Sequence, residues 1–189
     1  KHREHVKTFL LTDNLAERQQ TASRPLGIAF CAFHGAGIIP VPRLLRDVGF
    51  IDIKSIDGKK SGMRLNELDG LFPAFNSEPG REQQPDPGDP RAAHTAVEAF
   101  KEDYPGEFDN IDILIGTDPD ADRCGIVVKV PPDQKHIYNN QDYYLLPADD
   151  VWTLVLWYRL HREIEEHGEV RDADKKFIVL SHTTSDSIT

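Results

Sequence analysis

The sequence predicts an α/β fold: a Rossmann-like mixed sheet with flanking helices, followed by the first helix and strand of a second α/β domain. The order of the segments predicts this class, and the composition allows a core. Apolar runs typical of strands alternate along the chain with segments whose apolar residues recur at helical spacing. Apolar residues make up 39% of the 189 residues, which is enough for a core. The strand-like segments are residues 26–33, 50–56, 111–115, 124–130, 135–138 and 177–180.

The first elements can be assigned from local signals. Residues 3–20 can form a charged helix. The run from 26 to 33 is apolar throughout and therefore suits a strand that is covered on both faces. After the turn sequence HGAG at residues 34–37, two prolines favoured in a first helical turn open a helix over about 40–48, and Gly49 stands where a C-terminal cap is expected.

The middle of the chain predicts an exposed strand, a long loop and a helix. Residues 50–56 alternate between apolar and polar side chains, which is typical of a more exposed strand. Residues 72–91 are rich in proline, glycine and acidic residues, so we expect a long loop there. Asp89 and Pro90 are favoured as N-cap and first residue of a helix, and Pro105-Gly106 ends it. Its apolar stripe is Ala93, Ala96, Val97 and Phe100.

The character of the chain changes after residue 140. Residues 149–167 predict a long helix with a very apolar first half, and Gly168 is a natural stop. This helix and the strand at 177–180 have too little chain around them to build a core. We therefore expect them to open a second domain.

Charge and cysteine usage limit the partners and the compartment. The chain has 22 Lys and Arg against 32 Asp and Glu, and its net charge of −10 disfavours binding to nucleic acid. No run approaches the roughly 20 apolar residues that a membrane span needs, so no membrane partner is expected. Cys31 and Cys124 lie in apolar, strand-like segments, which predicts buried, reduced thiols and, without a signal-like start, a cytoplasmic location.

The most informative segment is the acidic loop, which we define as residues 116–123 (GTDPDADR). Alternate side chains of an extended segment point to one side, so Asp118, Asp120 and Asp122 can converge. Three carboxylates on a loop after a strand suit Mg²⁺, and the planar guanidinium of Arg123 matches a phosphate. In an α/β sheet this loop would lie at the carboxyl end of a strand, where ligands usually bind.

Other interpretations of these segments remain open at this point. An EF-hand is not among them, because it needs Gly and Glu at its sixth and twelfth positions, where this chain, counted from Asp118, has Arg123 and Lys129. An aspartyl-phosphate-type phosphatase would use Asp118 as nucleophile and Asp120 as acid/base. A non-catalytic nucleotide-binding module would cradle phosphate with residues 34–37, although these also suit a tight strand-to-helix turn.

The segment GTDPDADRCGIVV closely resembles the metal-binding loop of the α-D-phosphohexomutases, the phosphoglucomutase/phosphomannomutase family. The strand followed by HGAG and a helix, residues 33–48, is similar to the start of that family's second domain. Residues 140–143 (NQDY) and the helix after them resemble the passage into the third. The resemblance implies a linker helix over 1–20, the metal-binding α/β domain 2 over 21–140, and the truncated start of domain 3 over 141–189.

The resemblance also implies an activity. A phosphohexomutase is an isomerase that transfers a phosphoryl group reversibly between C1 and C6 of a hexose phosphate, through a phosphoserine and a bisphosphosugar intermediate. By motif, Asp118, Asp120 and Asp122 would bind Mg²⁺, and Arg123 would contact the phosphoryl group. His182 follows the last strand, where the family often has a lysine that faces the substrate.

The same resemblance implies what this chain would lack. The catalytic serine belongs to domain 1, and Ser23 lies in the wrong context to replace it. The partners would be the hexose phosphate, the bisphosphosugar and domains 1, 3 and 4 of the same protein. We therefore expect the isolated chain to be inactive, whereas a phosphatase would hydrolyse a phosphate ester by itself.

Overall fold

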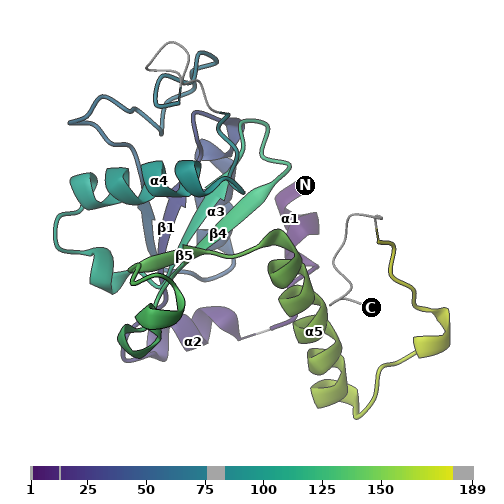
Figure 1. The fold of residues 1–189 in the computed structure, drawn as a ribbon. Coiled ribbons are helices and arrows are strands. Elements are labelled where there is room, and N and C mark those ends of the chain that lie inside the picture. The colour runs from purple at the N-terminus through teal and green to yellow at the C-terminus, as the bar shows by residue number, and fades with distance from the viewer. Residues whose placement is uncertain (1, 13, 76–83, 181–189) are drawn as a thin grey trace.

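A five-stranded mixed sheet forms the centre of the computed structural model, which describes residues 2–12, 14–75 and 84–180 (Figure 1). The strand order is β2-β1-β3-β4-β5. Strand β1 pairs in parallel with β2 and with the central strand β3, whereas the β3–β4 and β4–β5 pairs are antiparallel. The strands are β1 Gly27–Cys31, β2 Asp52–Ser55, β3 Ile113–Thr117, β4 Cys124–Lys129 and β5 Tyr143–Leu145. The predicted α/β class with a mixed sheet is confirmed.

The helices flank this sheet, and α4 crosses one of its faces (Figure 1). The α-helices are α1 His2–Lys7, α2 Leu15–Thr21, α3 Pro40–Asp47, α4 Pro90–Asp103 and α5 Ala148–His167. Short 3-10 helices are η1 Ala36–Ile38, η2 Phe108–Asn110, η3 Pro132–Ile137 and η4 Ala173–Lys175. The helices predicted after residue 40, after Asp89 and from about 149 are all present.

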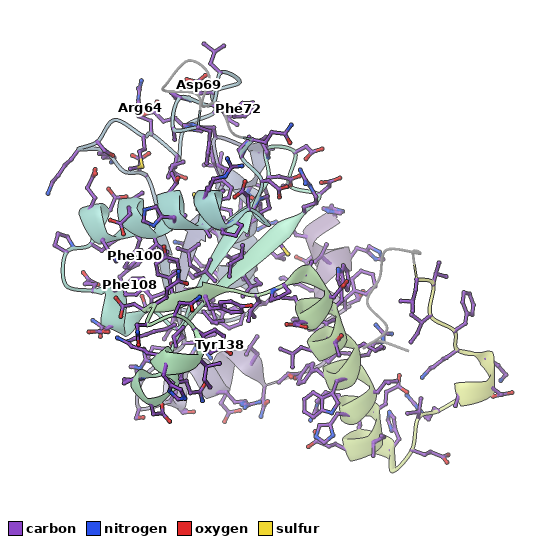
Figure 2. All side chains as sticks on the ribbon, viewed as in Figure 1. Arg64, Asp69, Phe72, Phe100, Phe108 and Tyr138 are labelled. Carbon is purple, nitrogen blue, oxygen red and sulfur yellow. The ribbon has the colours of Figure 1, made fainter. Side chains whose placement is uncertain are left out.

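The core lies between α4 and the sheet. All five residues of β1 are buried, as the continuous apolar run predicted. Phe100 of α4 is 1% exposed, and its ring centroid lies 6.2 Å from that of Phe108 (Figure 2). Burying a phenylalanine of this kind stabilises the fold by about 1.5–3 kcal/mol. The other buried side chains of this core come mainly from α4 and the strands, among them Ala29, Cys31, Ala93, Ala96, Val97, Leu114 and Val127.

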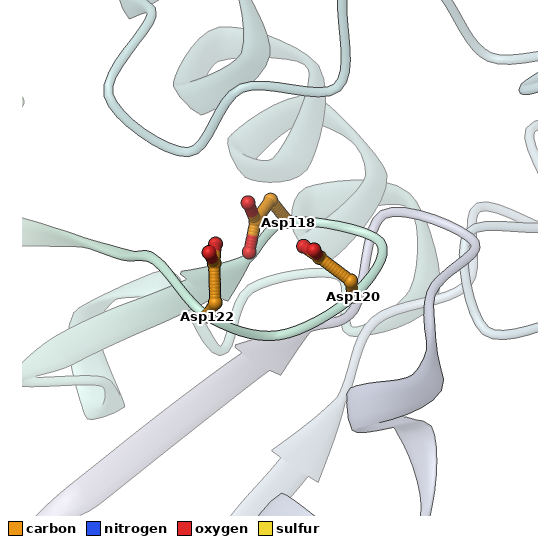
Figure 3. A group of neighbouring side chains, drawn as sticks. All are labelled: Asp118, Asp120 and Asp122. Atoms are coloured by element: carbon orange, nitrogen blue, oxygen red, sulfur yellow. The ribbon is translucent and has the colours of Figure 1, made fainter.

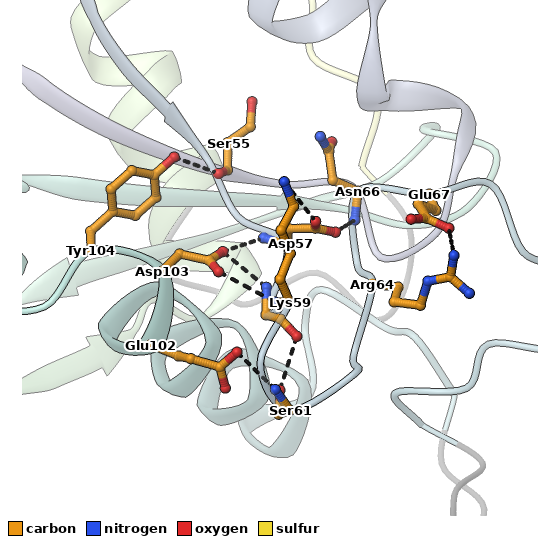
Figure 4. Close-up of polar contacts among 11 residues, drawn as sticks. Ser55, Asp57, Lys59, Ser61, Arg64, Asn66, Glu67, Glu102, Asp103 and Tyr104 are labelled. Atoms are coloured by element: carbon orange, nitrogen blue, oxygen red, sulfur yellow. Dashed lines mark hydrogen bonds and ion pairs between the residues drawn. The ribbon is translucent and has the colours of Figure 1, made fainter.

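Both ends of α4 are fixed by groups that the sequence places there. Asp89 accepts a hydrogen bond from the backbone N–H of Arg91 at 2.8 Å, as expected for an N-cap before a proline. At the other end, Asp103 accepts hydrogen bonds from the backbone N–H groups of Asp57 at 2.6 Å and Gly58 at 2.9 Å (Figure 4). The last turn of α4 therefore holds the loop that follows β2.

The helix predicted over residues 3–20 is wrong, because two short helices replace it. The N–H groups of Thr8, Phe9 and Leu10 bond to carbonyl groups three residues earlier, at 3.0–3.2 Å. Such tight bonds end an α-helix. The chain becomes helical again only in α2, after Asn14.

Two predicted strands are also absent. Residues 135–137 belong to η3 and Tyr138 follows its end, and the strand that pairs with β4 on the side away from β3 is β5, further along the chain. Residues 177–180 form no strand, because no described strand lies beside them to supply hydrogen bonds. The predicted domain boundary at 140 stays a prediction, and β5 extends the first sheet beyond it.

Helix α5 leaves the sheet and buries none of its residues (Figure 1). It ends at Gly168, which has a φ of +79° and donates its N–H to the Ile164 carbonyl at 2.8 Å. The hydroxyl groups of Tyr158 and Thr12 lie 2.8 Å apart, so α5 contacts the N-terminal segment. Within the described part of the chain, no helix has the length and apolar character to cross a membrane.

Candidate metal centre

The candidate site lies where the order of the strands reverses. The chain runs from β1 to β2 on one side and returns to β3 on the other side of β1. Because β1 and β3 are parallel neighbours, the HGAG turn after β1 and the acidic loop after β3 come to the same edge of the sheet. Ligands of open α/β sheets bind in the crevice at such a position.

The acidic loop brings its three carboxylates together (Figure 3). Asp118, Asp120 and Asp122 each offer an oxygen, and these oxygens lie within 4.8 Å of one another. The loop is a turn, not an extended segment: Ala121 has a φ of +59° and donates its N–H to the Asp118 carbonyl at 2.9 Å. The expected convergence is present, but a left-handed residue produces it instead of strand-like alternation.

These residues fit a hard divalent cation. Mg²⁺ binds oxygen at about 2.0–2.1 Å, so its neighbouring and opposite ligands lie about 3 and 4 Å apart. The three carboxylate oxygens lie within 4.8 Å of one another, so a cation that met this spacing would draw them closer together. Asp118 is 2% exposed and lies at the base of the site, whereas Asp120 and Asp122 are exposed. A cation held here would keep positions open for water or a phosphate oxygen.

Arg123 fixes the buried carboxylate. Its backbone N–H donates to Oδ1 of Asp118 at 2.9 Å, and its Nε donates to Oδ2 at 2.7 Å. Burial alone would raise the pKa of Asp118, but these hydrogen bonds from Arg123 outweigh it and lower the pKa. The pKa of Asp122 is raised by its hydrogen bond with Asp118 and by the negative charge of Asp120. Negative charge is therefore crowded in the loop, as expected of a cation site.

Arg123 has a second partner that the sequence did not reveal. Its Nη1 donates to Asp86, in the loop that precedes α4, at 3.3 Å. Its side chain is still 56% exposed and lines a groove of about 1300 Å³. The groove also includes Asp122, Tyr143 and Trp152. No sequence signal identified Asp86, because its proline-rich loop has no pattern that fixes its position.

The HGAG turn is a tight strand-to-helix connection. The N–H of Gly35 donates to Ala32 at 2.8 Å, and that of Ala36 donates to the Pro119 carbonyl at 2.7 Å. Both donors are engaged within the protein, which disfavours the nucleotide-binding alternative. Asp118 accepts hydrogen bonds on both oxygens and is buried, which also makes it a poor nucleophile for the phosphatase alternative.

Two further sequence expectations concern single residues. His182 lies outside the described residues. Cys31 is buried as predicted, but Cys124 is exposed, because it precedes the part of β4 that pairs with β5 and lines the groove.

Comparison with known proteins identifies the domain. A family model described as phosphoglucomutase/phosphomannomutase, alpha/beta/alpha domain II, matches residues 4–130. This chain belongs to the phosphoglucomutase/phosphomannomutase family. A phosphoglucomutase of Staphylococcus aureus strain N315 is 28% identical over 137 residues, and that of strain Mu50 matches equally. The aligned segment covers 72% of this chain but 20% of each phosphoglucomutase, so the chain spans about a fifth of the relatives that it matches.

Proposed function

We propose that this chain supplies the Mg²⁺-binding loop of a phosphohexomutase. The full-length protein would be an isomerase that transfers a phosphoryl group reversibly between C1 and C6 of a hexose phosphate. The transfer would pass through a phosphoserine outside this chain and a bisphosphosugar intermediate. The observation that carries the proposal is the convergence of Asp118, Asp120 and Asp122 in one loop at the carboxyl end of β3.

The roles of the residues follow from their environments. Bound Mg²⁺ would neutralise charge on the phosphoryl group, the main requirement of such a transfer. Asp118 would hold the cation as a fully ionised, immobile ligand, because Arg123 orients both of its oxygens. The two exposed aspartates would complete the set from the solvent side. The exposed guanidinium of Arg123 would orient the phosphoryl oxygens beside the loop.

Binding of Mg²⁺ to the 189-residue chain tests the assignment. We expect measurable but weak binding by calorimetry, because three carboxylates leave the site open without the phosphoserine. Asp120→Asn keeps the side-chain shape and removes one charge, so it should weaken binding about tenfold or more. Asp133→Asn makes the same change on exposed η3 and serves as the control. Identical curves for wild type and Asp120→Asn would overturn the metal assignment.

A further inference from the structure

We propose that the HGAG turn is a positioning element for the acidic loop, and that Gly35 and Gly37 are there because the loop packs directly against their backbone. The inference deepens the proposed metal-binding function and rests on it. Gly35 and Gly37 would be positioning residues that do not touch the cation. They would act by fixing where the Asp118–Asp120 segment lies.

The two segments are in direct backbone contact. The N–H of Ala36 donates to the carbonyl of Pro119, which lies between the first two proposed ligands, at 2.7 Å. A Cβ at Gly35 would lie 2.4 Å from Pro119 Cα and 2.6 Å from its carbonyl oxygen. Both atoms belong to the backbone, so no side-chain rotation can relieve the overlap. Any larger residue at position 35 must therefore displace the loop or the turn.

The second glycine contacts the start of the loop. A Cβ at Gly37 would lie 2.6 Å from Oγ1 of Thr117, the residue directly before Asp118. Thr117 is 6% exposed, so its side chain has little room to move away. The HGAG turn thus contacts the acidic loop on both sides of Asp118, the buried carboxylate.

The turn cannot easily yield, because its other side is also held. His34 is 2% exposed and has a φ of +63°, a conformation that needs support from its surroundings. Its N–H donates to the Leu65 carbonyl at 3.0 Å, and its Nδ1 lies 3.3 Å from the Glu67 carbonyl oxygen. The loop that supplies these carbonyl groups is itself held by Asp103 of α4 (Figure 4). A displacement at Gly35 is therefore passed to the acidic loop.

Two variants and one control test this inference. Gly35→Ala places a methyl group against Pro119. Ala36→Pro removes the N–H donor at an exposed position that tolerates proline as the first residue of a helix, and its ring displaces the Pro119 carbonyl. Gly70→Ala is the control, because an added Cβ there meets nothing within 4 Å. All variants are measured at a temperature at which circular dichroism shows them folded.

The measurements are hydrogen exchange of the Ala121 amide, by NMR without metal, and Mg²⁺ affinity by calorimetry. We expect exchange to be at least about tenfold faster in Gly35→Ala and Ala36→Pro, because the turn inside the acidic loop, which the Ala121 N–H closes, loosens. Exchange in the core strands should stay unchanged. We also expect their Mg²⁺ affinity to fall by a similar factor, while Gly70→Ala behaves like wild type.

The outcomes separate the two proposals. Unchanged Ala121 exchange in both variants would overturn the positioning role, whatever the loop binds. Where Asp120→Asn does weaken Mg²⁺ binding, faster exchange with unchanged Mg²⁺ affinity in Gly35→Ala and Ala36→Pro would also overturn it, because the HGAG turn would then not set the ligand geometry. Failure of the metal assignment itself appears instead in Asp120→Asn, and in that case the exchange data still decide whether the turn positions the loop.

Discussion

Thr117→Val should stabilise the protein, although it removes a polar group beside the proposed metal centre. The hydroxyl of Thr117 is buried, and it has no hydrogen-bond partner among the described residues. An unpaired buried hydroxyl costs about 1–3 kcal/mol, and valine keeps the same branched shape on a strand. A methyl group is slightly larger than a hydroxyl in this crowded place, so we expect a net gain of about 1 kcal/mol.

Urea unfolding followed by far-UV circular dichroism, in the presence of a chelator, measures this gain. For a chain of this size, 1 kcal/mol corresponds to about 2–4 °C in melting temperature. Thr95→Val is the matched control: it removes a hydroxyl that does have a partner, the Arg91 carbonyl at 3.0 Å, so it should be neutral or slightly destabilising. If Thr117→Val lowers the free energy of unfolding by 1 kcal/mol or more, the hydroxyl has a partner and the reasoning is wrong.

Two other predictions concern the partly buried Asp103 and the buried Cys31. Asp103→Ala removes the acceptor of the N–H groups in the loop after β2 and should lower the free energy of unfolding by about 2 kcal/mol. Asp109→Ala, at an exposed ion pair, is the control and should change it by less than about 0.5 kcal/mol. Equal losses of the two variants in chemical denaturation would contradict this prediction. Burial raises the pKa of the Cys31 thiol to about 12, so a thiol reagent at neutral pH should modify exposed Cys124 alone in the folded chain, and mass spectrometry of peptides would detect any contrary labelling.

The elements that sequence predicted well are those fixed by neighbouring residues. The start of α4 was predictable because Asp89 and Pro90 form a local cap, and β1 because its apolar run allows no exposed face. The segment at 135–138 failed for the opposite reason. A strand needs a partner, and residues 143–145 take the place beside β4.

The site shows the same division. The three aspartates could be found from their spacing and residue type alone. The route to their convergence could not, because it depends on a left-handed Ala121 in a closed turn. The contacts of Pro119 with Ala36 and of Arg123 with Asp86 join segments far apart in sequence, and no local pattern indicates such a meeting.

The placement of the aromatic residues has a practical consequence for spectroscopy. Both tryptophans of the chain, Trp152 and Trp157, are on α5, with exposed fractions of 66% and 56%, and none is in the sheet. Intrinsic fluorescence of the native chain should therefore emit at the long wavelengths of solvated indole, and urea should change it little even while the sheet unfolds. The same signal becomes a selective reporter of contact with α5, because any partner that covers this helix should shift the emission to shorter wavelengths.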